Sequence, residues 1–172
     1  MLATGKATLS QIKSVGVTLD EFASLAEHNG ARVQMYRPED SSEAQFRSQL
    51  IRASRVHAAP HIVVAFSRRT LAQTGDGHFS PVAGYHAETD SVLVLDVARF
   101  KYPPYWVPIP LLWEAMMPHD QETGTARGFA MLDAKATCPM WDAWKHEQDR
   151  LAHREVEMGH KGEAYSELRA ES

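Results

Sequence analysis

The chain has 172 residues, of which 44% are hydrophobic, and this composition predicts a single sizeable core. A formal net charge of −4, without any Lys/Arg run longer than two residues, gives no basis for nucleic-acid binding, and a single Cys excludes an intrachain disulfide. Because no apolar stretch approaches the ~20 residues of a membrane span and the N-terminus has no apolar signal core, we expect a cytoplasmic protein without a membrane segment.

Two helix–strand pairs are predicted in the first part of the chain. A capping box over Thr18–Glu21 begins the first helix, and Asn29-Gly30 ends its apolar stripe. The predicted elements are a helix over 18–29, a strand over 31–36, a helix from Ser41 or Ser42 through about Ser54, and a strand over 61–66. The last of these is apolar and β-branched, as is typical of a central strand.

The second part of the chain predicts an antiparallel sheet with shorter helices. Two strand-like runs, 78–86 and 91–96, flank a polar turn over Ala87–Asp90. The elements expected after them are a Pro-rich corner over 103–108, a short helix over 110–117, a strand over 127–132 and a polar helix over 139–157. Trp106 and Trp113 are expected to pack this corner into the core. Helices early and an antiparallel sheet later predict an α+β fold.

The most informative part of the sequence is the pair of strands that carries His78 and Asp96. A hairpin folded symmetrically about Ala87 places these two residues opposite each other, with both side chains on one face and Cβ atoms ~5 Å apart. An imidazole held by a carboxylate is half of a nucleophilic catalytic constellation. The same two residues are also compatible with a polar pair that is satisfied at the end of a sheet.

Five segments of the sequence resemble the phytochelatin synthase family. They are TLDEFASLAEHNGA, QTGDGHFSPVAGYH, LDVARFKYPPYWVP, LLWEAM and RGFAML, so the resemblance runs from about Gly16 to about Leu132. That family has a papain-like cysteine-protease fold; it cleaves glycine from glutathione and transfers the γ-glutamylcysteinyl group to another glutathione or to water. The resemblance implies a partial papain-like α+β domain over 1–135, the C-terminal portion of the catalytic domain, followed by a C-terminal helix and tail over 136–172.

The resemblance also implies roles for the His/Asp pair and raises a question about the nucleophile. His78 corresponds to the general base and Asp96 to its orienting acid, but the family's nucleophilic Cys lies N-terminal to the resembling part and would fall upstream of Met1. The only Cys is Cys138, which follows both residues in the chain and is expected to be a structural thiol. The sequence therefore represents part of a longer enzyme, a remnant without its nucleophile, or a catalytically inactive module that binds glutathione or metal thiolates.

Further residues are candidates for substrate binding. The γ-glutamyl end of glutathione is an amino acid, so its pocket needs an anion for the ammonium group and a cation for the carboxylate. The resemblance implies Asp120 and Arg127 for these two contacts, and Arg99, Lys101 and Tyr102 for a second glutathione. From the residues alone, Asp120 and Arg127 are a solvated loop carboxylate and an edge-strand Arg. Arg99 is also a candidate buried partner of Asp96.

No dedicated metal site is predicted, although the chain has nine His. His146, His153 and His160 recur every seven residues, which separates them by ~10 Å along a helix, too far to share an ion. Pro60 interrupts the spacing between His57 and His61. The resemblance implies instead a heavy-metal ion, Cd or Zn, that enters as a metal–glutathione thiolate substrate or activator. Glutathione is the expected partner, and a homodimer is possible.

Overall fold

The computed structural model describes residues 16–55, 60–134 and Arg150. The chain divides into two units, 1–134 and 135–172, and the fold described below is that of the first. The predicted polar helix over 139–157 and the environment of Cys138 lie outside the described residues.

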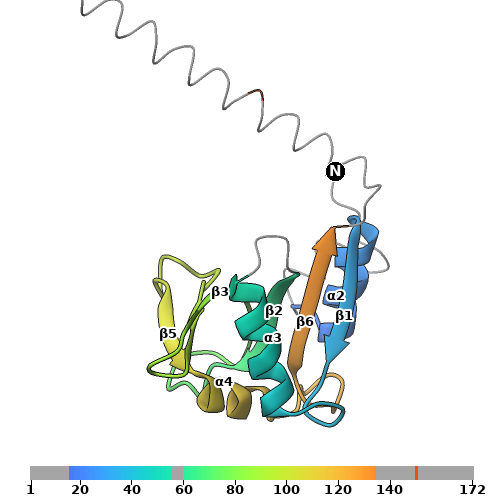
Figure 1. Ribbon diagram of the computed structural model, residues 1–172. Helices are drawn as coiled ribbons and strands as arrows, with labels where there is room; N and C mark the ends of the chain where they lie inside the picture. The colour runs from blue at the N-terminus through green and yellow to red at the C-terminus, as the bar shows by residue number, and fades with distance from the viewer. Residues whose placement is uncertain (1–15, 56–59, 135–149, 151–172) are drawn as a thin grey trace, which may run out of the picture. The chain divides into compact units, whose positions relative to one another are not determined.

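The described residues build one six-stranded sheet with helices on both faces (Figure 1). Its strands lie in the order β1-β6-β2-β3-β4-β5, and every neighbouring pair is antiparallel. Their bounds are β1 Ala31–Tyr36, β2 His61–Ser67, β3 Gly77–His86, β4 Ser91–Val94, β5 Tyr105–Pro108 and β6 Gly128–Ala134. The predicted α+β fold is confirmed, and the last strand in sequence is inserted between the first two.

Helix α2 (Leu19–His28) packs against one face of the sheet, near β1 and β6. Thr18 caps it as the sequence predicts, since its Oγ1 accepts a hydrogen bond of 3.2 Å from the Glu21 amide while its own amide donates to the Glu21 carboxylate at 2.9 Å. Leu19 and Ala23 are buried by this helix. The capping box therefore fixes where the chain enters the helix, and with it the position of the residues just before Thr18.

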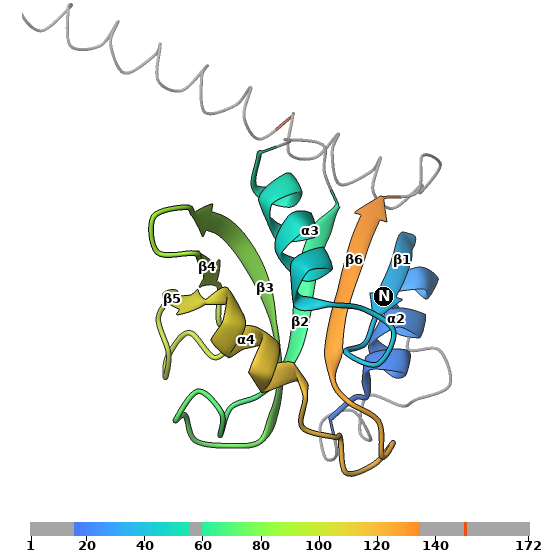
Figure 2. The same ribbon diagram turned by 60° about the horizontal axis from the view of Figure 1, so that its bottom comes forward.

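Helices α3 (Glu43–Arg55) and α4 (Ile109–Met116) cover the opposite face, where Figure 2 shows them side by side in front of the sheet. The Ser42 hydroxyl accepts from the Gln45 amide at 3.2 Å and so caps α3, one of the two predicted choices. The main core lies beneath these two helices. Its largest fully buried side chains include Phe46, Phe66, Phe129, Leu50, Leu112 and Met116.

Two predictions about the Pro-rich segment were wrong. Tyr105–Pro108 is an edge strand, β5, paired with β4, and not a corner. Its one proline, Pro108, is tolerated because an edge strand has an unpaired side. Trp113 is buried in the core as predicted, but Trp106 is 51% exposed. Trp106 projects from the face of β5 opposite to Val107, which is buried. None of the described helices is long and apolar enough to cross a bilayer.

Candidate active site

His78 and Asp96 are in direct contact at the end of the sheet. His78 Nε2 lies 3.0 Å from Asp96 Oδ1. The Asp96 side chain is completely buried, whereas that of His78 keeps 17% of its surface exposed. The predicted meeting of imidazole and carboxylate is therefore confirmed, with the carboxylate on the inside and the imidazole at the surface.

The two residues meet for a different reason from the one predicted. The turn over Ala87–Asp90 has four residues, and such a turn by itself sends His78 and Asp96 to opposite faces of the hairpin. The pairing then shifts by one residue at Ala83, where β3 forms a β-bulge. This shift returns both side chains to the same face. The predicted symmetric register was wrong, although the contact it predicted is present.

Asp96 is held by three donors that converge on a single oxygen. Its Oδ1 accepts from Arg68 Nη2 at 2.9 Å and from the Ala98 amide at 2.8 Å, in addition to His78, while Tyr105 donates to Oδ2 at 3.4 Å. Burial alone would raise the pKa of Asp96, but the hydrogen bonds from Arg68 and Ala98 and the nearby positive charge hold that pKa below its ordinary value. Asp96 is therefore ionised at neutral pH.

An ionised Asp96 determines which nitrogen of His78 carries the proton. The carboxylate can only accept, so Nε2 donates and Nδ1 is left with its lone pair. Burial and the positive charge of Arg68 lower the pKa of His78. Together these two effects outweigh Asp96, which raises it. The ring of Phe66 meets the imidazole edge-on, with 5.7 Å between the ring centroids. His78 is thus a neutral, oriented base, and no described residue forms a hydrogen bond to Nδ1.

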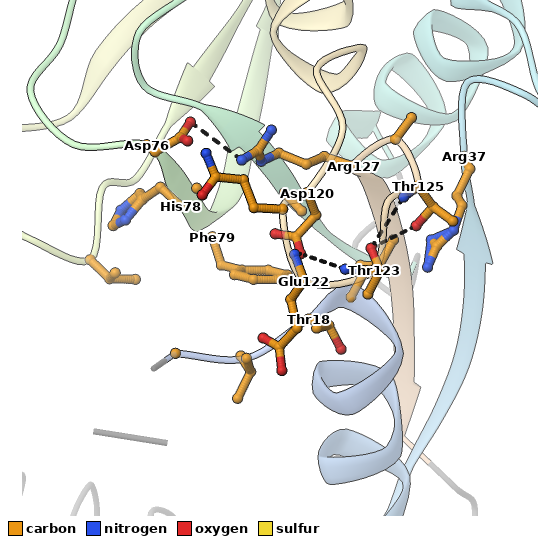
Figure 3. Close-up of a pocket in the computed structure, with 18 residues that line it drawn as sticks. Thr18, Arg37, Asp76, His78, Phe79, Asp120, Glu122, Thr123, Thr125 and Arg127 are labelled. Carbon is orange, nitrogen blue, oxygen red and sulfur yellow. Dashed lines mark hydrogen bonds and ion pairs between the residues drawn. The ribbon is translucent and has the colours of Figure 1, made fainter. Parts of the chain in front are cut away.

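His78 lines a cavity of about 510 Å³. The cavity wall is made mainly by residues 16–19, 76–79, 120–123 and 125–127. Figure 3 shows His78 and Asp76 on one side and Arg37 on the other, with the loop that carries Asp120 between them. A base and several charged groups thus share one concave surface, which is the usual arrangement of a substrate site.

Arg127 is buried beneath the cavity wall, immediately before β6. Its Nη1 donates to the carbonyl oxygens of Pro118 and His119 at 2.7 and 3.2 Å, and its Nη2 lies 3.3 Å from Asp76 Oδ1. Because β6 lies between β1 and β2, the sequence interpretation of Arg127 as an edge-strand residue was wrong. The Nε of Arg127 is buried without a partner among the described residues, as is Nη1 of Arg37.

Asp120 shapes the loop that closes the cavity. Its Oδ1 accepts from the Glu122 amide at 3.0 Å and from the Thr123 amide at 3.2 Å, an arrangement that stabilises a tight turn. Both bonds use Oδ1, and no described residue donates a hydrogen bond to Oδ2. Asp120 and Arg127 both line this cavity.

Arg99, Lys101 and Tyr102 lie on the loop after Asp96, and none of them lines this cavity. Arg99 is exposed and forms no ion pair with a described residue, so the alternative that it is the buried partner of Asp96 was wrong; Arg68 has that position. The Tyr102 hydroxyl accepts from the Thr74 amide at 3.0 Å, and the hydrogen bonds with Thr74 lower the pKa of Tyr102.

A family sequence profile described as phytochelatin synthase matches residues 1–129 of this chain. The chain belongs to the phytochelatin synthase family. It is 44% identical over 131 residues to glutathione gamma-glutamylcysteinyltransferase 1 of Triticum aestivum. It is 45% identical over 131 residues to glutathione gamma-glutamylcysteinyltransferase 3 of Lotus japonicus, and 44% identical over 126 residues to glutathione gamma-glutamylcysteinyltransferase of Schizosaccharomyces pombe. These matches cover 76%, 76% and 73% of this chain but only 26%, 27% and 30% of the relatives.

Two charged residues of this phytochelatin synthase family member were not found by sequence reasoning. Arg68 is the partner of Asp96, and the available signal was a cation directly after the apolar strand over 61–67. Arg37 lines the cavity opposite His78, but nothing in its local sequence distinguishes it from a surface Arg.

Two glycines flank Asp76. Gly75 has a φ of +102°, a conformation that favours glycine. Gly77 lies close to the Arg127 guanidinium, since a Cβ at this position would be 3.4 Å from Nη2.

In the described part of the chain no three His, Cys, Asp or Glu side chains gather as a metal site.

Proposed function

We propose that the described residues form the substrate-binding and base-bearing part of a glutathione gamma-glutamylcysteinyltransferase with a papain-like fold. The observation that carries the proposal is the oriented, neutral His78, a residue that lines a cavity with charged walls and whose Nδ1 has no partner among the described residues. The names of the relatives supply the substrate and the transferred group. In this proposal residues 1–135 are the C-terminal portion of the catalytic domain.

The proposed reaction is acyl transfer through a thioester. A thiol gives its proton to His78 Nδ1, and the thiolate attacks the carbonyl carbon of the Cys–Gly amide of glutathione. His78 then protonates the nitrogen of the departing glycine as the C–N bond breaks. The amine of a second glutathione, or water, loses a proton to His78 and attacks the thioester, which releases the thiol. Asp96 stabilises the imidazolium in both steps.

The thiol in this proposal comes from a cysteine outside the described residues. The given sequence has one Cys, Cys138, which follows His78 and Asp96 in the chain. We assign it no catalytic role, because the proposed roles of His78 and Asp96 are those of a family whose nucleophile precedes them. A single Cys in this position also supports a second candidate function, a module that binds glutathione or its metal thiolates without turnover.

The charged cavity suits the γ-glutamyl end of glutathione. Its volume of about 510 Å³ falls within the ~300–1,000 Å³ of small-molecule sites. We assign the ammonium group to Asp120, whose Oδ2 is uncommitted, and the carboxylate to Arg127. Arg37 is a second cation that lines the cavity, and its Nη2 is paired with Asp20 at 2.6 Å.

The remaining assignments concern the acceptor, the metal and the assembly. We assign Arg99, Lys101 and Tyr102 to a second glutathione, because they lie on the loop that continues from Asp96 but outside the cavity of the first. A heavy-metal ion, Cd or Zn, enters as a glutathione thiolate that serves as substrate or activator. The proposal includes a cytoplasmic location and a homodimer.

Glutathione binding and intact mass together test the proposal. Titration calorimetry of the chain with glutathione is expected to show saturable binding that Asp120→Asn weakens at least about tenfold, because a charged partner of the ammonium group is lost. Glu88→Gln, an exposed change on the β3–β4 turn, serves as the matched control and leaves binding unchanged. Absence of saturable binding contradicts both candidate functions.

Mass spectrometry of the same mixture separates the two candidates. We expect no γ-glutamylcysteinyl adduct and no glycine release from the 172-residue chain alone, because the thiol lies elsewhere. An adduct that disappears in Cys138→Ala identifies Cys138 as the nucleophile and contradicts the assignment made above. Binding by the 172-residue chain, with an adduct only after a Cys-bearing segment is supplied, supports the transferase; binding that never leads to an adduct supports the module.

A further inference from the structure

Arg68 is a buried cation that bonds directly to Asp96. It follows directly after β2, and its side chain is only 6% exposed. Nη2 donates to Asp96 Oδ1 at 2.9 Å, and Nη1 donates to Gln73 Oε1 at 2.7 Å. The guanidinium carbon lies 4.7 Å from the centre of the Tyr102 ring. The hydrogen bonds of Nη1 and Nη2, together with the Tyr102 ring over one face, fix the orientation of the guanidinium.

Arg68 and His78 share one acceptor atom. Both donate to Oδ1 of Asp96, and the Ala98 amide donates to the same oxygen. While His78 is neutral, the charges of Arg68 and Asp96 cancel inside a buried site. A proton on His78 would leave this site with an uncompensated positive charge, which burial disfavours. Arg68 therefore opposes the tendency of Asp96 to make His78 a cation.

The surroundings of the pair contain few other groups that could have this effect. Phe66 on β2 meets the imidazole edge-on, and Asp96, in the segment after β4, accepts from it. Arg68, just after β2, bonds to Asp96. Tyr105 on β5 reaches the second oxygen of Asp96, and burial raises the pKa of its hydroxyl, so it remains neutral. Among these groups Arg68 is the one cation that bonds to Asp96.

We propose that Arg68 is a positioning residue that fixes Asp96 Oδ1 against His78 Nε2 and balances the Asp96 charge, so that Asp96 orients the imidazole without making it cationic. The inference rests on the proposed function for the role of His78 as a base. It extends that function from the pair His78 and Asp96 to a group of three residues, in which Arg68 sets the protonation state of His78. Arg68 acts through Asp96 and needs no contact with substrate.

The test is the titration of His78 by NMR in the full 172-residue chain. The His78 ring signal is assigned by its loss in His78→Gln. In Arg68→Gln the titration midpoint of His78 is expected to move upward, so that at the wild-type midpoint the cation outnumbers the neutral form at least about threefold. Arg68→Lys keeps the positive charge and is expected to restore a midpoint close to that of the wild type. A role limited to packing would not distinguish Gln from Lys in this way.

Arg69→Gln is the matched control, because Arg69 is the adjacent residue and is exposed. It is expected to leave the His78 midpoint unchanged. A midpoint in Arg68→Gln that stays in place, moves downward or moves no more than in Arg69→Gln overturns the inference. If Arg68→Gln does not unfold cooperatively, the wild-type chain decides: the Arg68 guanidinium signals must show an inflection at the His78 midpoint, and a flat response overturns the inference.

This outcome is independent of glutathione. If the His78 midpoint moves upward in Arg68→Gln but the chain does not bind glutathione, the role of Arg68 stands and the proposed function is contradicted. If the chain binds glutathione but the midpoint does not change, the proposed function stands and the role of Arg68 is contradicted.

Discussion

At Asp96 one carboxylate oxygen serves an Arg, a His and a backbone amide, and this crowding explains why the residue tolerates complete burial. A buried charge is costly unless it is paired and hydrogen-bonded. Each donor has a separate consequence: Ala98 fixes the loop after Asp96, Arg68 balances the charge, and His78 gains an orientation. The chemistry of the site therefore depends on a residue that no ligand in the cavity needs to touch.

The depressed pKa of His78 predicts how stability depends on pH. Burial and Arg68 lower this pKa in the folded chain, so the unfolded chain binds the proton more readily. The stabilisation is present above the unfolded value of about 6.5 and is lost as the pH falls from there through the folded pKa. Urea unfolding at a series of pH values should therefore show a steeper loss of unfolding free energy between about pH 7 and 5 in the wild type than in His78→Gln.

The control for this comparison is Arg69→Gln, an exposed change that leaves every imidazole of the chain in place. It should keep the wild-type slope. Equal slopes in the wild type and in His78→Gln would contradict the lowered pKa.

At the scale of elements, β6 joins the core to the cavity. Arg127 precedes it and Phe129 on it packs against Phe46 at 4.8 Å between ring centres, so a displacement of β6 moves the cavity floor and the core together. Gly128 lies between them, close against the backbone of Tyr36 on β1. A Cβ at this position would meet the Tyr36 carbonyl oxygen.

Gly128→Ala is therefore expected to destabilise the chain. A new methyl group against rigid backbone should lower the unfolding free energy by about 1–3 kcal/mol, as measured by urea denaturation. Gly84→Ala is the matched control, because the same change in β3 meets only the Trp106 ring at 3.8 Å, an ordinary contact. Equal losses of unfolding free energy in Gly128→Ala and Gly84→Ala would contradict the close approach of β6 to β1.

At the scale of the whole molecule, the sequence predicts most elements but not how they interlock. Capping residues and apolar periodicity mark α2, α3 and β2, since these signals are local. Edge strand β5 is not predicted because Pro103 and Pro104 before it and Pro108 at its end argue against a strand, and only the pairing with β4 overrides this signal.

The site divides in the same way. The contact of His78 with Asp96 follows from a hairpin, whereas the bulge at Ala83 that creates it has no local signal. Arg68 is 28 residues from Asp96 in the chain, so periodicity cannot connect them.

The sheet order makes one prediction for the whole unit. Because β6 pairs with both β1 and β2, a chain that stops at Arg127 leaves two strands without their shared neighbour. We expect this fragment to show no cooperative thermal transition, whereas a fragment of residues 1–134, which keeps β6, should unfold cooperatively. A cooperative transition in the shorter fragment would contradict the central role of β6.

The insertion of β6 also sets an order of events during protein synthesis. Strands β1 and β2 leave the ribosome long before β6, which pairs with both of them. Until β6 has emerged, each strand has an unpaired edge with which another extended peptide can pair. The nascent polypeptide therefore passes through a stage in which the chain up to Ser67 has been synthesised but β1 and β2 still lack their shared neighbour. Chaperone engagement and misassembly are to be sought in that interval, and they should end once residue 134 emerges.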